Sequence, residues 1–267
     1  MNIMNSKQSM RLAAVILSGG SLLLIVSLTV ILYHNFVQAQ QGSDPYTFPV
    51  NSSPYGISYK NWTAKWAAWQ EEIPKSYNWN FKDTPGVNYV PKDCSFMQDP
   101  SSPVFFLPWV GKELGTYATV TCIVPHNKAI LISVDAGTAD YSDPSVKTKT
   151  PSELNRLVTA SNIYPNEFKA TLDGHSLDLI NDEAHKVTSG LFNLTLPKDN
   201  VWGEPEGPDK AITQGWWLML KPLPAGEHTV HYTTGYGNSK SDPTKIPPGQ
   251  GNPKPYIQDV TYHLVVK

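Results

Sequence analysis

The hydrophobic pattern changes its period several times along the chain, and its first stretch is not periodic at all. Residues 12–33 carry no charge and consist mostly of Leu, Ile, Val and Ala. At a rise of about 1.5 Å per residue, a helix of this length would cross the hydrocarbon core of a bilayer. Lys7 and Arg11 precede the segment, and no cation follows it before Lys60. This asymmetry predicts a cytoplasmic N-terminus, with the rest of the chain outside the membrane.

Two interpretations of this apolar segment remain open. Its length favours a signal anchor that stays in the membrane, whereas the Ser18-Gly19-Gly20-Ser21 break and the small residues at Val37-Gln38-Ala39 favour a cleaved signal peptide. Residues 1–39 are therefore a cytoplasmic tip followed by a signal peptide or anchor. Residues 40–57, rich in Gln, Ser, Pro, Gly and Asn, are predicted to be a linker, and residues 58–267 an extracytoplasmic domain.

The first periodic segment predicts a helix over Tyr59–Glu72. Trp62, Trp66 and Trp69 are spaced i, i+4 and i+7, which places them on one helical face. Pro74 disfavours helical geometry at the residue before it and ends the helix.

A second helix is predicted to begin at a capping box. Thr150 and Glu153 occupy the two capping positions, and a proline follows Thr150 at the first helical position. Leu154, Leu157 and Val158 form its apolar stripe.

The remaining pattern is short and mostly alternating, which predicts strands. The C-terminal strand is typical: Val260, Tyr262 and Leu264 face one side, while Asp259 and His263 face the other. The predicted strands are Val104–Leu107, Tyr117–Val124, Lys128–Val134, Phe168–Leu172, Ser176–Ile180, Leu191–Leu196, Trp216–Leu220, Glu227–Thr234 and Tyr256–Val266. We expect a mainly β fold, a β-sandwich of Ig-like or jelly-roll-like type decorated by the two short helices.

The charge composition argues against one class of function, nucleic-acid binding. Charged residues make up 16% of the chain, the net charge is −2, and Arg11 and Arg156 are the two arginines. Nucleic-acid binding requires clustered basic charge, so it is not expected.

The two cysteines and three glycosylation sequons agree with export. Cys94 and Cys122 are predicted to form a disulfide, the alternative being two buried thiols. Sequons begin at Asn51, Asn61 and Asn193. Because Asn61 lies inside the predicted helix, Asn51 and Asn193 are the expected glycosylation sites.

The tryptophans suggest a carbohydrate-binding platform. Trp216 and Trp217 are adjacent on a strand and point to opposite faces, so one joins the core and Trp217 could join the turn residue Trp202 in stacking on a sugar. In the alternative, the tryptophan-rich helix covers the face of Trp217 and forms an aromatic core with it.

Two metal sites are also considered. His231, His263 and Asp259 share the outward face of predicted strands and would make a two-histidine, one-carboxylate site. The alternative is a set of solvated histidines. Asp135, Asp140 and Asp143 lie in a predicted loop, and their oxygens would suit Ca²⁺, the alternative being an ordinary acidic loop.

No catalytic motif stands out. Glu204 and Glu206 flank Pro205 near Trp202, but a glycosidase needs two carboxyls facing each other across a cleft. The sequence contains no Gly-x-Ser-x-Gly, His-Glu-x-x-His or phosphate-binding glycine motif. An enzyme is therefore not the favoured interpretation.

Several segments together resemble a set of exported archaeal and bacterial proteins of unknown function. The shared segments are Trp62-x3-Trp66-x2-Trp69, Cys94 with Val104–Leu107, Cys122–Pro125, Gly215–Leu220, Gly226–His231 and Asp259–Leu264. The resemblance implies export and a sandwich fold, and it assigns no chemistry to any residue.

The favoured function is a non-enzymatic surface or interaction module, either anchored in the cell membrane through residues 12–33 or secreted. Its partner would be a glycan or a surface protein. The alternatives are a carbohydrate-binding protein that uses exposed tryptophan and, less favoured, a secreted glycan hydrolase.

Overall fold

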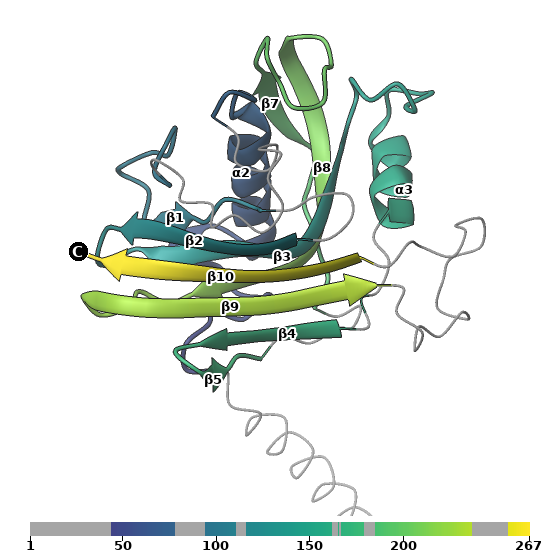
Figure 1. Ribbon diagram of the computed structural model, residues 1–267. Coiled ribbons are helices and arrows are strands. Elements are labelled where there is room, and N and C mark those ends of the chain that lie inside the picture. The colour runs from purple at the N-terminus through teal and green to yellow at the C-terminus, as the bar shows by residue number, and fades with distance from the viewer. Residues whose placement is uncertain are drawn as a thin grey trace, which may run out of the picture. The chain divides into compact units, whose positions relative to one another are not determined.

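The computed structural model describes residues 44–77, 94–110, 116–161, 165, 167–178, 185–236 and 256–267. The predicted membrane or signal segment at residues 12–33 lies outside this set, and within the set no helix is long and apolar enough to cross a membrane. Residues 46–267 form one compact unit. Its described part is mainly β, with two five-stranded sheets and two α-helices, as the sequence predicts at this level (Figure 1).

The first sheet is built around two long antiparallel strands. Its strands are β1 (Val104–Phe106), β3 (Ala129–Asp140), β8 (Gly207–Leu220), β6 (Val187–Thr188) and β7 (Phe192–Leu196). They follow the order β1-β3-β8-β6, and β7 pairs with the first part of β8. β1 runs parallel to β3, so the sheet is mixed.

The second sheet has the C-terminal strand in its interior. Its strands, in spatial order, are β2 (Thr116–Val124), β10 (Tyr256–Val266), β9 (Gly226–Tyr236), β4 (Glu167–Leu172) and β5 (His175–Ser176). β2 and β10 are parallel, whereas the other pairs are antiparallel. Asp173 and Gly174 join β4 to β5 with positive φ angles of 50° and 82°, as a two-residue hairpin turn of this kind requires.

The two sheets share a hydrophobic core. Phe105 and Ile132 from the first sheet and Val120, Tyr232 and Tyr262 from the second belong to one buried cluster. Cys94 and Cys122 lie in the same cluster and form a disulfide with a Cα–Cα distance of 5.5 Å, which confirms the predicted bond.

Helix α2 (Tyr59–Glu72) covers the other face of the first sheet, and its bounds are those predicted. Trp62, Trp66 and Trp69 are buried there together with Trp217 and Met219 of β8. The helix ends because Ile73, before Pro74, adopts extended geometry. The predicted aromatic core between this helix and the sheet is therefore confirmed.

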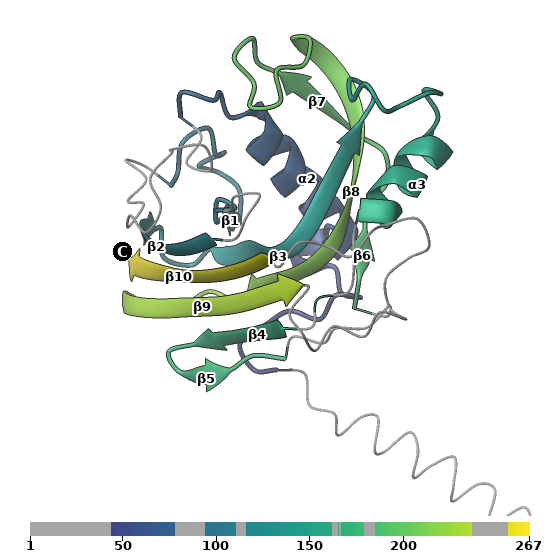
Figure 2. The same ribbon diagram turned by 45° about the vertical axis from the view of Figure 1, so that its right-hand side comes forward.

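The long strands of the first sheet continue well past their predicted ends. A bulge between Ser133 and Asp135 lets β3 bend away from the second sheet together with β8 (Figure 2). Gly215 faces this bulge, and a Cβ on it would lie 2.2 Å from the Asp135 carbonyl oxygen. The predicted loop with Asp135 and Asp140 is thus wrong, because both residues belong to β3.

Helix α3 (Pro151–Ser161) packs on this strand extension. Leu154 and Val158 contact Ala139 and Ile212 in a small apolar cluster. The Thr150 hydroxyl accepts a hydrogen bond of 3.3 Å from the Glu153 N–H, so the predicted N-cap is confirmed.

Candidate functional site

Four carboxyl groups from four different elements gather where the strand extension meets the end of α2. Glu71 comes from the last turn of α2, Asp140 from the end of β3, Asp209 from β8, and Glu204 from the loop between β7 and β8. We call these four residues the carboxylate cluster. They influence one another electrostatically, since the nearby charges of Glu71, Asp140 and Asp209 all raise the pKa of Glu204.

Ser142 holds two members of the cluster together. Its N–H lies 2.8 Å from both Asp140 Oδ1 and Asp209 Oδ2, and its hydroxyl donates to Asp209 Oδ2 at 2.6 Å. The Asp143 N–H also donates to Asp140 Oδ1. These donors fix the geometry of two carboxyls that would otherwise repel each other.

Burial makes Glu71, Asp140 and Glu204 unusually basic for carboxyl groups. Loss of hydration raises the pKa of Glu71 to about 7, although a hydrogen bond from Trp202 opposes the change. Burial, with the negative charge of Asp209 beside it, raises the pKa of Asp140 to about 6. Burial and the neighbouring acids raise the pKa of Glu204 to about 7. Near neutral pH Glu71 and Glu204 therefore retain protons for part of the time, and a protonated carboxyl donates as well as accepts hydrogen bonds.

Trp202 lies beside the cluster at the surface. Its side chain is 53% exposed, and its Nε1–H donates to Glu71 Oε2 at 2.5 Å. The loop that carries it is organised by the buried Asn200, whose Oδ1 accepts from the N–H groups of Trp202 and Glu204. The indole is thus held in one orientation while much of its surface stays accessible.

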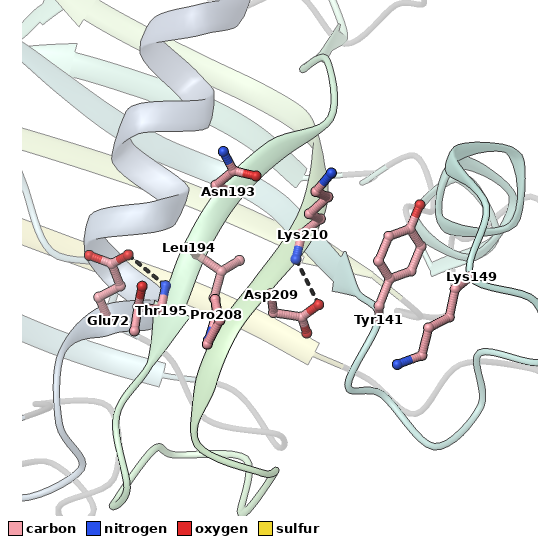
Figure 3. Close-up of a pocket in the computed structure, with 9 residues that line it drawn as sticks. All are labelled: Glu72, Tyr141, Lys149, Asn193, Leu194, Thr195, Pro208, Asp209 and Lys210. Carbon is pink, nitrogen blue, oxygen red and sulfur yellow. Dashed lines mark hydrogen bonds between the residues drawn. The ribbon is translucent and has the colours of Figure 1, made fainter.

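A polar cleft adjoins the cluster and shares Asp209 with it. The cleft has a volume of about 720 Å³ and is drawn in Figure 3. Its lining residues are Glu72, Tyr141, Lys149, Asn193, Leu194, Thr195, Pro208, Asp209 and Lys210. Tyr141 and Lys149 lie across from Asn193 and Thr195, and Glu72 Oε1 accepts a 2.8 Å hydrogen bond from the Thr195 N–H (Figure 3). The cleft is thus lined by carboxylate, amide, hydroxyl and amino groups and by one aromatic ring.

Trp217 lies away from this site. Its side chain is only 2% exposed, and its ring packs edge-on against Trp66 at 5.0 Å. A ring buried in this way presents no surface to a ligand, so Trp217 cannot join Trp202 in the expected platform.

The residues of the expected histidine site are only partly brought together. His231 Nε2 lies 2.8 Å from Asp259 Oδ1, whereas His263 pairs across the strands with Thr229 and Thr121. Among the described residues, no group of three or more His, Cys, Asp or Glu could hold a metal ion.

The residues of the expected calcium site also separate. Asp140 and Asp143 stay close, but Asp135 lies at the bulge, where its Oδ2 accepts a 3.4 Å hydrogen bond from the Thr234 hydroxyl. Asp140 instead belongs to the carboxylate cluster.

The sequence pattern singles out Glu204 and, for a different site, Asp140, but neither Glu71 nor Asp209. Glu206, the other expected carboxyl, is exposed, and Glu71 takes its place in the cluster. No local spacing links Glu71 to Glu204, because their proximity depends on α2 packing against β7 and β8. Asp140 is the one partner that the sequence marks, although the pattern there predicts a loop rather than the end of β3.

The sequons differ in their surroundings. Asn51 and Asn193 are exposed, and Asn193 lines the cleft, so both remain predicted glycosylation sites. Asn61 is exposed as well, but the Thr63 of its sequon is fully buried, with its hydroxyl donating to the Lys60 carbonyl.

Comparison of the chain with protein-family models, with curated proteins and with solved structures found no match.

Proposed function

We propose that this chain is an extracytoplasmic β-sandwich protein, Ig-like or jelly-roll-like, that serves as a non-enzymatic binding module. Residues 12–33 anchor it in the membrane, or cleavage after Ala39 releases it. The disulfide between Cys94 and Cys122 supports this location, because such bonds persist in oxidising compartments. The intact mass of the protein purified from its host distinguishes the anchored form from the cleaved one.

The proposed ligand is a carbohydrate, bound at the carboxylate cluster and the polar cleft beside it. The observation that carries this proposal is Trp202, an exposed indole whose orientation Glu71 fixes. An indole presents an apolar face on which the C–H face of a sugar ring can stack, while its N–H stays paired with a polar group.

The electrostatics of the cluster favour a neutral ligand with many hydroxyl groups. Carboxyls that hold protons near pH 7 supply both donors and acceptors, which match sugar hydroxyls. The cleft adds the Thr195 hydroxyl, the Tyr141 ring and two lysines. A volume of about 720 Å³ lies within the usual range for small-ligand sites.

A glycan array followed by thermal-shift measurements on the full-length chain in detergent tests the proposal. A bound glycan raises the apparent melting temperature by mass action. Trp202→Ala is expected to abolish that rise and Trp202→Phe to retain part of it. Tyr55→Ala, which removes an exposed aromatic side chain near the start of α2, serves as the matched control. The proposal fails if no glycan stabilises the protein, or if Trp202→Ala binds as tightly as the wild type.

A second candidate, a glycan hydrolase, is favoured by one specific observation. Glu71 and Glu204 both have a pKa near 7 and lie in one cluster, and a carboxyl with a raised pKa is the usual general acid of such enzymes. If the protein is a hydrolase, glycans that it binds will acquire new reducing ends during incubation. Glu204→Gln would then stop cleavage while leaving the thermal shift in place.

A further inference from the structure

A second hollow lies along α2, and we call it the α2 groove. Its helical wall has the spacing i, i+3, i+4 and i+7, which is one stripe of a helix surface. The residues of this wall are Lys65, Ala68, Trp69 and Glu72. The other wall comes from the loop of residues 97–103, which leads into β1. The groove has a volume of about 440 Å³ and extends along about two turns of the helix.

The α2 groove combines buried aromatic rings with exposed polar groups. Trp62 and Trp69 are buried, and their indole N–H groups donate to backbone carbonyls at 3.0 and 2.9 Å, so neither ring needs a polar partner in the groove. Among the exposed residues, Lys65 supplies a donor and Asp99 a charged acceptor, because hydrogen bonds from Ser101 hold the pKa of Asp99 below its ordinary value. An apolar lining with a few polar groups is typical of small-ligand sites, and it matches a sugar ring, which has C–H faces and a hydroxyl-bearing edge.

Met97 lines this groove in an uncommon backbone conformation. Its φ is 57°, a region that residues with a Cβ rarely adopt, and its side chain is 51% exposed. The side chain therefore gains little burial in return for the strained backbone. Strain of this kind gathers at ligand-binding positions, and the flexible, polarizable side chain of methionine adapts well to a bound molecule.

The α2 groove and the polar cleft meet at Glu72, which lines both. Ala68 of the groove also packs in one apolar cluster with Leu194 of the cleft. Figure 3 shows Glu72 on the α2 side of the cleft, with Tyr141 and Lys149 on the opposite side. A ligand that is longer than the cleft and leaves it past Glu72 therefore enters the groove.

We propose that the ligand of this protein is a chain of several linked sugars, which occupies the polar cleft with one part and the α2 groove with another. This inference rests on the proposed carbohydrate binding and adds the length of the ligand. Acids and lysines occur together in both hollows, as suits a chain without net charge: Asp209 with Lys210 in the cleft, and Asp99 with Lys65 in the groove. Once one hollow is occupied, binding in the other is intramolecular, so a longer chain binds more tightly.

Titration of the full-length chain in detergent with sugars of increasing length tests the inference. The probes are β-1,4-linked oligomers of glucose, N-acetylglucosamine and mannose, graded from disaccharide to hexasaccharide, and the same graded series cut from any other glycan that stabilises the protein. In a series that binds, we expect the hexasaccharide to bind at least about tenfold more tightly than the disaccharide.

A glycine substitution at Met97 tests the part that the groove plays. Glycine adopts positive φ readily, so Met97→Gly removes the side chain without straining the fold. We expect this variant to lose most of the gain in affinity from disaccharide to hexasaccharide. Asn127→Gly, at a φ of 63° and outside both hollows, is the matched control and should keep that gain. Trp202→Ala should weaken the binding of every length.

Oxidation by hydrogen peroxide supplies a second measurement. Met97 is exposed and should form its sulfoxide readily, whereas Met219 is fully buried and serves as the slow internal standard. The hexasaccharide should slow oxidation of Met97 several-fold, and the disaccharide should not. If affinity does not rise with length, or if Met97 is oxidised equally fast with the hexasaccharide bound, the inference is overturned while the proposed function stands. If no glycan of any length stabilises the protein, both are overturned.

Discussion

Glu71 and Glu204 bind protons more tightly in the folded protein than in the unfolded chain. The pKa of each is about 7 in the fold, against an ordinary value of 4.5. The folded state therefore retains protons that the unfolded chain releases between these two values. The resulting stabilisation is fully present below about pH 4.5 and is lost as the pH rises to about 7.

Replacing Glu71 by glutamine should reverse this loss. The amide oxygen can still accept the Trp202 N–H, but it carries no charge into the cluster. At pH 8 we expect Glu71→Gln to raise the free energy of unfolding by about 1 kcal/mol, a value reduced for partial solvent exposure. At pH 4 the variant and the wild type should match. Urea unfolding at the two pH values measures the difference in the free energy of unfolding between variant and wild type. Glu227→Gln, on the exposed start of β9, is the control. An equal difference at both pH values would contradict the raised pKa of Glu71.

His228 should show a related pH dependence for a different reason. Its Nδ1 lies 2.7 Å from Asp173 Oδ2 and its Nε2 lies 3.0 Å from the Pro224 carbonyl, so both ring nitrogens face acceptors. Only the imidazolium can donate to both. Burial lowers the pKa of His228, but the bonds and charge of these partners outweigh it and raise the pKa above its ordinary value.

The contribution of His228 to stability is thus present below about pH 6.5 and declines as the pH rises through the raised pKa. We expect His228→Gln to lose more stability at pH 5 than at pH 9, as measured by urea unfolding. His263→Gln, at an exposed position on β10, should change little at either pH. The interpretation fails if the ring of His228 is neutral by NMR at pH 6.

At the scale of elements, alternation and capping predicted most strands and both helices. α2 and β10 have the predicted bounds, because each has a clear apolar face bounded by turn residues. The extension of β3 and β8 was missed because its faces are covered by two helices rather than by another sheet. Thr213 and Gln214 are buried there through polar contacts, which leaves no alternating pattern to read.

The bend in this extension depends on Gly215. A methyl group on it would overlap the backbone of Asp135 and Ala136, which cannot move without breaking the strand pair. We expect Gly215→Ala to lower the free energy of unfolding by about 3 kcal/mol, at the upper end of overpacking costs. Gly190→Ala, where no atom lies within 4 Å of the new methyl group, is the matched control. Comparable stability of the two variants in urea would show that the bulge does not constrain the strands.

At the scale of the whole molecule, the first sheet lies between the second sheet and α2. Alternate residues of β8 therefore pack into two different hydrophobic clusters. Leu218 and Leu220 face the second sheet, while Trp217 and Met219 face α2. The disulfide adds a covalent link between β2 and the segment that leads into β1.

Removing this link should cost stability. Cys94 and Cys122 are 28 residues apart, and closing such a loop is worth about 3.6 kcal/mol in the chain-entropy model. A Cys94→Ala, Cys122→Ala double variant should lose about that amount in urea unfolding. Wild type measured in dithiothreitol is the comparison, because it opens the loop without removing either sulfur from the core. If the double variant and the reduced wild type both keep the full free energy of unfolding, the disulfide does not stabilise the fold.

The place of β10 between β2 and β9 affects how the protein is made. Gln258 pairs with Thr116, so the second sheet cannot close until β10 has been synthesised, long after β2. Pairing over such a separation is also slow, because the loop must close before any contact stabilises it. During this interval β2 lacks the strand with which it pairs, so the second sheet and the core beneath it are incomplete. For the exported protein proposed above, strand order would thus delay completion of the fold until β10 has been synthesised.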